Sequence, residues 1–519
     1  MLVKTFSSTV FGIHANTITI EVNLGIGINF YLVGLPDNAV KESQQRIKAA
    51  FSNNDLKFPG REITVNMAPA DIRKEGSLYD LPIAVGILAV SGQVECAHLT
   101  EYVLIGELSL DGSLQPTKGV LPIAIQSKKE GFKGLIVPKQ NAREAAVVDG
   151  IEILGADSLM EVVSFLNGDD TALERFTFKT NAFASATDTN TQLDFDEVKG
   201  QMMIKRAFEI AAAGSHNIML IGPPGAGKSM LAKRLPTILP PMTLPEALET
   251  TTIHSVAGKM KSSSGLITMR PFRKPHHTIS DIGLIGGGSH PQPGEISLAH
   301  NGVLFLDELP EYKRQVLEVL RQPLEDRYVN ISRAKFSIDY PAGFMLVAAM
   351  NPCPCGYFNH PEKECVCAPG VVQRYLNRIS GPLLDRIDLH IEVTPVKFDE
   401  LTAQLPTEKS EVIRTRVISA REIQKERYGG REGIHANAHM SQKEVDQYCS
   451  LSNECMSILK MAMEKLGLSA RAYDRIVKVS RTIADLEGEK NIMPQHLAEA
   501  IQYRSLDKNL NTVVLSKVG

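Results

Sequence analysis

The sequence predicts a multidomain α/β protein, and three observations support this prediction. In the middle of the chain, runs that are apolar throughout alternate with helical segments, which is typical of parallel strands buried on both faces. A stretch rich in Thr, Ala, Asn and Asp separates this part from an N-terminal region of mixed strands and helices. After residue 398 the pattern becomes helical. With 519 residues, the chain is long enough for about three or four domains.

These observations divide the chain into four expected parts. We expect an α+β domain over residues 1–170, a linker over 171–194, a core with a parallel sheet over 195–397, and a helical lid domain over 398–519. The expected core strands are the buried runs "NIMLIG", "GVLFLDE" and "FMLVAAMN". A sheet of this kind collects ligand-binding residues at the carboxyl ends of its strands.

Finer patterns predict individual elements within the two outer domains. The N-terminal domain contains β-like runs such as "TITIEV", "EITVNMA" and "GLIVP", with amphipathic helices over 38–51 and 119–130. In the C-terminal domain, Ser441 and Glu444 have the spacing of a capping box, and apolar residues follow one face of a helix over 469–487.

Composition limits the classes of function. The net charge of −3 offers no overall basic footprint, so nucleic-acid binding would depend on local patches. The N-terminal segment lacks both the apolar core of a signal peptide and the roughly 18 apolar residues of a membrane span, which predicts a cytoplasmic protein without a membrane partner. The cysteine count of seven is odd, which favours reduced thiols and makes metal binding the better interpretation of a cluster.

The motif "GPPGAGKS" predicts a phosphate site, because it follows an apolar strand and precedes a helix. Its residues are Gly222, Pro223, Pro224, Gly225, Ala226, Gly227, Lys228 and Ser229. Glycines let backbone N–H groups surround a phosphate, the lysine neutralises phosphate charge, and the serine hydroxyl is a ligand for Mg²⁺. The alternative, a chance glycine turn, does not explain the flanking elements.

The run "GVLFLDEL" places Asp307 and Glu308 at the carboxyl end of a second strand. We expect Asp307 to hold Mg²⁺ and Glu308 to orient or polarise the attacking water. The alternative is that the two acids cap a helix. A third strand ends at Asn351, an amide that could position the same water.

These motifs together resemble the AAA+ ATPases. Within them, "RPFRKPHHTISDIGLIGGGSHPQPGEISLAHNGVLFLDELPE" resembles the magnesium-chelatase-like ComM/YifB group. The resemblance implies a homo-oligomeric ring, usually a hexamer, that uses ATP and Mg²⁺. It also implies roles for Asn351 as sensor 1, Arg386 as the arginine finger that reaches a neighbouring subunit, and Arg471 as the sensor-2 arginine of the lid. For Arg374 and Arg378, surface salt bridges are the better interpretation.

The cysteine-rich insert over 353–367 predicts a metal site. Cys353, Cys355, Cys365 and Cys367 form two C-x-C pairs, and four thiolates can close a tetrahedral Zn²⁺ site. Free thiols, and redox or iron–sulfur use, remain alternatives, because C-x-C is less diagnostic than C-x-x-C. His360 is interpreted as a bystander. We expect structural zinc to fix this long connection and to brace the subunit interface.

The N-terminal domain resembles the proteolytic domain of Lon proteases without its catalytic pair. The resemblance lies in "PADIRKEGSLYDLPIAVGIL" and in a second segment over 104–141. The expected position of the nucleophile is Leu78, and Ser77 lies one residue before it. The expected position of the lysine is about Val120, and Lys118 lies two residues before it. A Ser/Lys dyad needs both groups in register, so we expect a platform that is not a peptidase.

Two segments are candidates for DNA contact. In residues 325–343, apolar and polar residues alternate on both sides of a possible turn, as expected for a hairpin in the pore of a ring. The glycine-rich segment over 283–295 would be a second pore element. The predicted DNA contacts are Arg333, Lys335, Ser289 and His290. The alternative for the two basic residues is that they are solvated edge-strand charges. The basic segment over 270–277 could instead pack near a neighbour's nucleotide.

The leading hypothesis is an ATP-driven ring that moves branch points in DNA, as the resemblance implies for recombination and natural transformation. Single-stranded or branched DNA and recombination proteins are the partners this hypothesis implies. The rival hypothesis is a chelatase-like ATPase that remodels a protein or metal complex, although the chain contains no D-x-S-x-S motif. A third is an ATP-dependent switch or scaffold.

Overall fold

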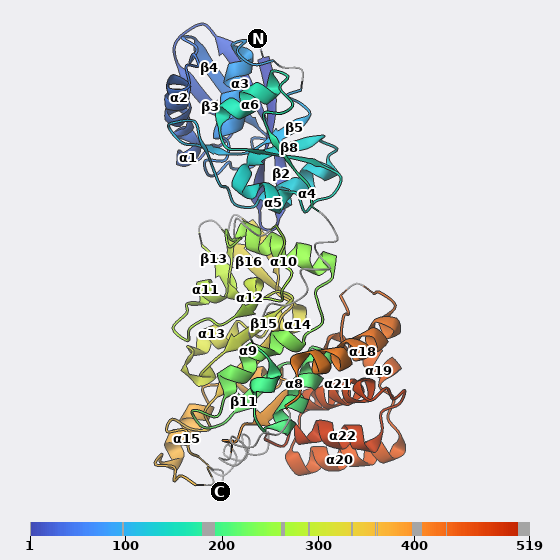
Figure 1. Ribbon diagram of the computed structural model, residues 1–519. Helices are drawn as coiled ribbons and strands as arrows, with labels where there is room; N and C mark the ends of the chain where they lie inside the picture. Colours follow the sequence, from blue (N-terminus) through green and yellow to red (C-terminus); the bar gives the residue numbers. More distant parts are fainter. Residues whose placement is uncertain are drawn as a thin grey trace.

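Three bodies follow one another along the chain: an N-terminal α/β domain, a central core, and a helical domain packed beside that core (Figure 1). The computed structural model describes residues 2–95, 98–178, 193–260, 265–288, 291–333, 336–358, 360, 362–396, 407–431 and 433–506. Within this part of the chain, no helix is both long and apolar enough to cross a membrane. The multidomain α/β fold predicted from the sequence is confirmed.

The N-terminal domain is built on a mixed eight-stranded sheet. Its strands, in spatial order, are β10 (Glu174–Phe176), β9 (Glu152–Ala156), β8 (Gly134–Pro138), β5 (Tyr102–Leu104), β1 (Leu2–Phe11), β2 (His14–Gly25), β4 (Glu62–Ala68) and β3 (Phe30–Val33). β5, β8 and β9 are parallel, whereas β1, β2 and β4 are antiparallel. Because β10 pairs with β9, this sheet continues past residue 170, where the sequence predicts the linker to begin.

Helices cover the sheet, and the main ones are α2 (Ser43–Asn53), α3 (Asp80–Val90), α4 (Val120–Lys129), α5 (Lys139–Ala145) and α6 (Leu159–Leu166). All residues of α3 are buried, and apart from Asp80 its sequence is apolar, as expected for a helix enclosed by a core. The predicted helices over 38–51 and 119–130 correspond to α1 (Asn38–Lys41) with α2, and to α4.

The core contains a five-stranded sheet in which all neighbouring strands are parallel. The order is β12 (Phe272–Arg273), β15 (Val303–Leu306), β18 (Met345–Met350), β11 (Ile218–Ile221) and β19 (Leu389–Glu392). The residues of β11, β15 and β18 are all buried, as their apolar runs predict. The flanking helices include α8 (Met202–Gly214), α9 (Lys228–Ile238) and α10 (Leu244–Val256).

Two hairpins leave the core on the side that faces the N-terminal domain (Figure 1). The larger consists of β16 (Tyr328–Arg333) and β17 (Phe336–Pro341), and the smaller of β13 (Gly286–Gly287) and β14 (Gln292–Pro293). The antiparallel hairpin predicted over 325–343 is therefore confirmed.

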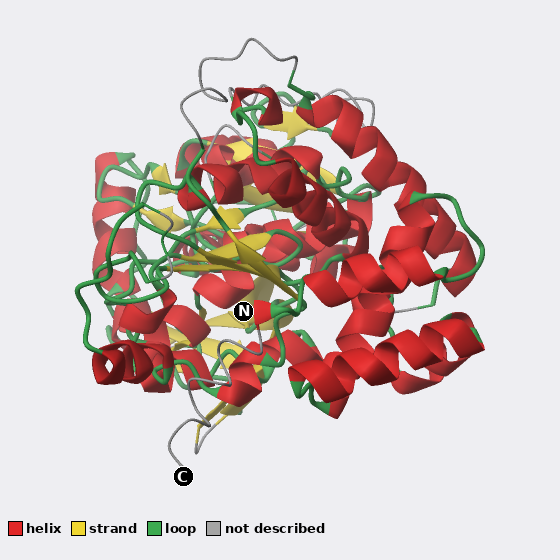
Figure 2. Ribbon diagram, turned by 90° about the horizontal axis from the view of Figure 1, so that it is seen from below, coloured by secondary structure: helices red, strands yellow, loops and turns green. Residues whose placement is uncertain are grey.

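The C-terminal domain is helical, and Figure 2 shows its helices grouped on one side of the strand-containing part. Its helices are α18 (Ser410–Tyr428), α19 (Gln442–Tyr448), α20 (Asn453–Leu466), α21 (Ala470–Leu486) and α22 (Pro494–Gln502). The Ser441–Glu444 capping box is confirmed at the start of α19. The helix predicted over 469–487 is α21, and its apolar face packs into the hydrophobic core that also contains β11 and β18.

The N-terminal domain and the core share a hydrophobic cluster. Met242, Ala247 and Leu266 of the core are buried together with apolar residues of α4 and α5. The joint also has polar contacts, because Ser255 Oγ donates to the Glu144 carboxylate and the Gly119 amide donates to the Ser255 carbonyl at 3.1 Å. A shared apolar core opposes independent motion of two domains.

Candidate nucleotide site and metal centre

The loop between β11 and α9 has the backbone that a phosphate-binding loop requires. Gly225 and Gly227 have φ angles of +80° and +86°, in the left-handed region that favours glycine. A Cβ atom at Gly222 would lie 2.2 Å from the carbonyl oxygen of Val393, so no side chain fits there. The loop ends where α9 begins at Lys228, so free N–H groups of the first helical turn border it.

Lys228 connects this loop to the neighbouring strand end. Its Nζ atom donates to the carbonyl oxygens of Gly222 at 2.7 Å and Pro223 at 2.9 Å, and to Asn351 Oδ1 at 3.1 Å. Burial lowers the pKa of the Lys228 ammonium. Because Ile221 pairs with Met350 across the parallel strands, the next residues on both strands meet at the same edge.

Asp307 lies at the same edge, one strand further along the sheet. Ser229 Oγ donates to Asp307 Oδ2 at 2.8 Å, so the predicted hydroxyl and carboxylate ligands of a magnesium ion are in contact. Burial works to raise the pKa of Asp307, but hydrogen bonds from Lys274 and Ser229 outweigh it and keep this pKa below its usual value. The Asp307 side chain is therefore held as a carboxylate.

Glu308 follows Asp307 in an unusual backbone conformation, with φ 52° and ψ 49°. Such a conformation is uncommon for a residue other than glycine and is often found at functional sites. The Glu308 side chain is exposed and makes no capping bond to the short helix that follows. The alternative that this acid serves as a helix cap is therefore not supported.

The structure adds two residues to this edge that the sequence analysis did not assign to it. Lys274 Nζ lies 2.9 Å from Asp307 Oδ2, and His277 Nδ1 lies 3.5 Å from Glu308 Oε2. Both come directly after β12, which pairs in parallel with β15. The sequence did contain a signal for this proximity. The run "KPHH" directly follows β12 and the run "DEL" directly follows β15, and the carboxyl ends of neighbouring parallel strands lie at the same edge of a sheet.

Arg386, the predicted arginine finger, is buried in its own subunit with 5% exposure. Its guanidinium forms an ion pair with Glu325 at 2.7 Å and donates to the Pro382 carbonyl at 2.6 Å. Neither of these two contacts of Arg386 is with the phosphate loop of its own subunit. A role in a neighbouring subunit stays a prediction, and it would require Arg386 to leave Glu325.

Arg471, the predicted sensor-2 residue, lies exposed in the first turn of α21. Ser469, just before this helix, contacts Asp385 at 3.5 Å, so the lid helix begins beside the segment that carries the predicted arginine finger. Arg378 forms a surface ion pair with Glu311 at 3.0 Å, as expected for a structural arginine.

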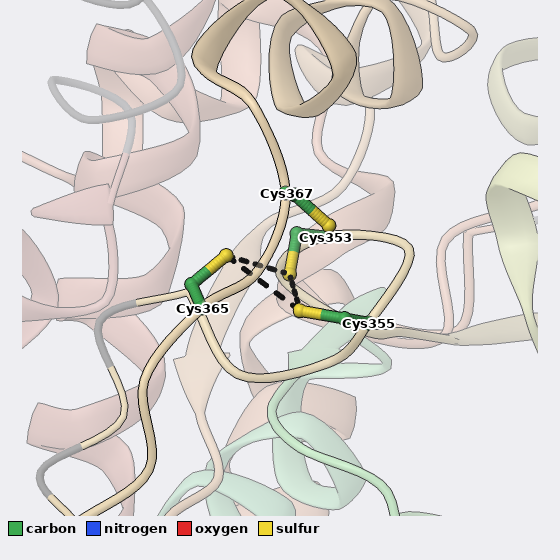
Figure 3. Close-up of side chains that lie close together, drawn as sticks. All are labelled: Cys353, Cys355, Cys365 and Cys367. Atoms are coloured by element: carbon green, nitrogen blue, oxygen red, sulfur yellow. Dashed lines mark hydrogen bonds between the residues drawn. The ribbon is translucent and has the colours of Figure 1, made fainter.

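The four cysteines of the insert gather as the metal hypothesis requires (Figure 3). Cys353 Sγ lies 3.3 Å from Cys355 Sγ and 3.7 Å from Cys365 Sγ, and Cys355 Sγ lies 3.6 Å from Cys365 Sγ. The ligand atoms of all four, Cys367 included, lie within 4.8 Å of one another. Tetrahedral zinc with Zn–S bonds of about 2.3 Å needs sulfur separations of about 3.8 Å, so the donor set fits such an ion.

The immediate neighbours of the cluster clarify two expectations about it. His360 Nδ1 accepts backbone hydrogen bonds from Glu362 at 3.0 Å and Lys363 at 3.1 Å, which agrees with its interpretation as a bystander. The turn of the insert packs on the phosphate loop, since a Cβ at Gly356 would lie 2.5 Å from Pro224 Cδ. The contact seen in the chain is thus with its own nucleotide loop.

The two candidate DNA-binding segments lie side by side. A Cβ at Gly286 would lie 3.1 Å from Ile331 Cδ1, and Tyr340 Oη donates to the Pro291 carbonyl at 2.9 Å. The β1–β2 turn of the N-terminal domain also contacts the larger hairpin, because a Cβ at Gly12 would lie 2.7 Å from Ile338 Cγ2. The predicted contacts Ser289, His290 and Lys335, and the side chain of Arg333, lie outside the described residues.

Among the described residues of the N-terminal domain, neither expected position of a Lon-type Ser/Lys pair carries the required side chain. Leu78 carries no nucleophilic atom, and the Ser77 hydroxyl donates to the Glu107 carboxylate. The aliphatic part of Lys118 lies against Gly258 of the core. The lysine is thus part of the contact between the two domains.

Comparison with known families covers most of the chain. The family model described as "Magnesium chelatase, subunit ChlI" matches residues 194–401. Models for "Subunit ChlI of Mg-chelatase" and for the C-terminal part of the same subunit match residues 20–141 and 407–504.

Individual proteins extend this comparison. The chain is 46% identical to competence protein ComM of Haemophilus influenzae over 503 residues, which covers 96% of this chain and 97% of the relative. It is 44% identical to the YifB protein of Escherichia coli over 502 residues, covering 96% of each. A shorter match, 27% over 124 residues, covers 24% of this chain and 22% of Lon protease 2 of Bacillus subtilis.

Proposed function

The chain belongs to the ComM/YifB family of magnesium-chelatase-like AAA+ proteins, and we propose that it is a ring-forming ATPase that moves branch points in DNA. The observation that carries ATP hydrolysis is the hydrogen-bonded group at one sheet edge. There Lys228 contacts Asn351, and Ser229 contacts Asp307. Three strands thus present a cation, a hydroxyl, a carboxylate and an amide to the same small volume.

Each residue of this group has a defined part in the proposed reaction. The loop amides and Lys228 bind the β- and γ-phosphates, and Glu308 orients the attacking water, with Asn351 beside it. Ser229 and Asp307 would hold Mg²⁺, which neutralises phosphate charge when bound. The oxygen donors fit this ion, whereas the sulfur cluster does not.

A ring completes the proposed site. Arg386 would offset the charge that develops on the γ-phosphate of a neighbouring subunit, and Arg471 would contact the nucleotide from the lid. Arg386 forms its ion pair with Glu325 of α14 (Pro323–Asp326), a short helix that lies directly before the larger hairpin. A hairpin that moves with bound DNA would thereby influence the arginine.

DNA is the proposed substrate on which the ring acts. The two hairpins lie together, and the predicted contacts at Arg333, Lys335, Ser289 and His290 would bind phosphates without reading bases. The name of the relative, competence protein ComM, supports a role in competence. Our proposal extends this role to recombination, with recombination proteins as further partners. The N-terminal domain would serve as a platform, since it shares a core with the ATPase and contacts the larger hairpin.

Zinc in the cysteine cluster is proposed as a structural ion. Cys353, Cys355, Cys365 and Cys367 would bind it and fix the insert against Pro224 of the phosphate loop. The ion therefore supports nucleotide binding directly, in addition to any effect on the subunit interface.

The test is steady-state ATP hydrolysis by the purified protein without DNA and with single-stranded, duplex and four-way-junction DNA. Lys228→Ala is the control for hydrolysis by this site. We expect branched or single-stranded DNA to stimulate hydrolysis, and Arg333→Ala/Lys335→Ala to remove the stimulation while retaining the rate without DNA. Lys228-dependent hydrolysis that no DNA alters would instead support remodelling of a protein partner.

A further inference from the structure

We propose that His277 is a positioning residue for Glu308, so that the segment after β12 forms a further wall of the ATP site. This inference rests on the proposed ATPase function and assigns to it a residue outside the loop, the acidic strand and the strand-terminal amide. The observation that points to it is the contact between His277 Nδ1 and Glu308 Oε2 at 3.5 Å.

The side chain of Glu308 needs a neighbouring group that restricts its rotamers if it is to orient water. Its side chain is 57% exposed, and its backbone adopts the left-handed conformation that turns it away from the strand. Among the contacts between acidic and basic side chains in the described part of the chain, the one that includes Glu308 is with His277. An exposed carboxylate without such a contact samples several rotamers, and catalysis by water activation requires one.

His277 is itself held from several sides. Its ring packs on His276 with centroids 4.2 Å apart and meets the Tyr312 ring edge-on at 6.4 Å. Tyr312 Oη donates to the Pro275 carbonyl at 2.7 Å, which fastens the backbone two residues before the histidine. Since Tyr312 follows the acidic strand end, the two segments are tied together independently of the histidine–glutamate contact.

Among the ion pairs of the described residues, Lys274 contacts only one of the two neighbouring acids. Its ammonium contacts Asp307 at 2.9 Å and lies 5.2 Å from the centre of the Phe305 ring. The lysine therefore pairs with the acid that also contacts Ser229, whereas His277 pairs with the acid next to it. Two adjacent carboxylates repel each other, and separate cationic or donor partners keep them in different orientations.

The same segment also extends toward the glycine-rich hairpin. Arg273, directly before Lys274, makes a bidentate ion pair with Glu295 at 2.6 and 2.7 Å. Glu295 is the first residue of α12 (Glu295–Leu298), which begins right after β14. One short segment thus contacts the glycine-rich segment through Arg273 and Glu295, and the water-activating acid through His277.

The experiment compares three variants of the full-length protein by the dependence of hydrolysis rate on ATP concentration. His277→Phe keeps an aromatic ring against Tyr312 but removes the nitrogen, and His277→Asn returns a nitrogen near the position of Nδ1. His276→Phe is the matched control, because the Nδ1 atom of His276 bonds to Thr278 at 2.9 Å rather than to the acids. Thermal melting checks the fold of each variant.

A positioning role predicts a loss of kcat with little change in KM. For His277→Phe we expect kcat to fall about 10- to 100-fold with KM within about twofold of the wild-type value, since misplacement of a reacting group acts on the chemical step. His277→Asn should recover part of the loss, and His276→Phe should behave as wild type. All three should melt near the wild-type temperature.

Several results would overturn the inference. These are a wild-type kcat in His277→Phe, a rise in KM alone, or equal losses in His276→Phe and His277→Phe, which would indicate packing only. In all of them the wild-type protein still hydrolyses ATP through Lys228, so the ATPase part of the proposed function stands. A wild-type protein without Lys228-dependent hydrolysis would instead refute the proposed function and this inference together.

Discussion

The core and the N-terminal domain differ in whether they keep the site residues of the families that they resemble. In the core, side chains from three strand ends are in contact: Lys228 with Asn351, and Ser229 with Asp307. In the N-terminal domain, Leu78 stands where the Lon-like pattern expects a nucleophile, and Ser77 is bonded to Glu107. Both regions have well-packed cores. The difference teaches that a fold can persist where the residues of a site are replaced, because packing and reactive groups are set by different residues.

The comparison predicts large effects of single changes in the core, and the largest concerns Arg386. Arg386→Ala should lower ATP hydrolysis about 10³-fold or more if its guanidinium acts on a neighbouring γ-phosphate. Lys228→Ala should be inactive for a different reason, since it cannot bind the phosphates productively. Mixing the two inactive proteins should restore activity, because a mixed ring combines an intact loop with an intact arginine. No recovery on mixing would show that Arg386 acts within its own chain, where it contacts Glu325.

The next effect concerns the acid with the left-handed backbone. Glu308→Gln keeps the size and polarity of the side chain but removes its basicity, so hydrolysis should fall about 10²- to 10⁴-fold. ATP binding, measured by displacement of a fluorescent nucleotide, should remain within about twofold, because the loop and Lys228 are unchanged. A variant that hydrolyses ATP normally would remove Glu308 from the proposed reaction.

A smaller effect is expected from the cysteine cluster. Cys353→Ser removes a buried thiol, so bound zinc, measured by elemental analysis, should be lost. Because the insert packs on Pro224, the KM for ATP should rise about tenfold. Cys449→Ala, which changes a buried cysteine outside the cluster, is the control. A zinc-free protein with unchanged KM and unchanged ring formation would contradict the structural role of the metal.

The smallest effect is expected in the N-terminal domain. Ser77→Ala removes one hydrogen bond to Glu107 and should lower the free energy of unfolding by about 1 kcal/mol. ATP hydrolysis should not change, and no peptide cleavage should be present in either protein. Loss of a peptidase activity on this substitution would reverse the comparison between the two domains.

Local patterns predicted those parts of the molecule in which neighbours in sequence are also neighbours in space. The phosphate loop needs glycines between a strand and a helix, and Gly225 and Gly227 have the expected φ angles. The Ser441–Glu444 box caps its helix as its spacing requires. Apolar runs predicted β11, β15 and β18 because buried parallel strands have no polar face.

Contacts between distant segments were not predictable in this way. The segment with Lys274 and His277 reaches the acids because β12 pairs with β15, and nothing in the basic run itself specifies that pairing. The same holds for the contact of the insert with Pro224, whereas its expected role at a subunit interface stays a prediction. The ion pair between Arg386 and Glu325 likewise depends on the packing of α14 beside Arg386.

By itself, the sequence determined the order of the domains, the strand and loop residues of the candidate nucleotide site, the cluster of four thiols and the leucine at the expected position of a Lon-type nucleophile. Each of these depends on residue type at short spacing, which the chain carries directly. Only the tertiary structure decided which cation contacts which acid, which loop the cysteine-rich insert contacts, and how the N-terminal domain is joined to the core. Those contacts depend on strand order and domain packing, which bring together residues far apart in the chain.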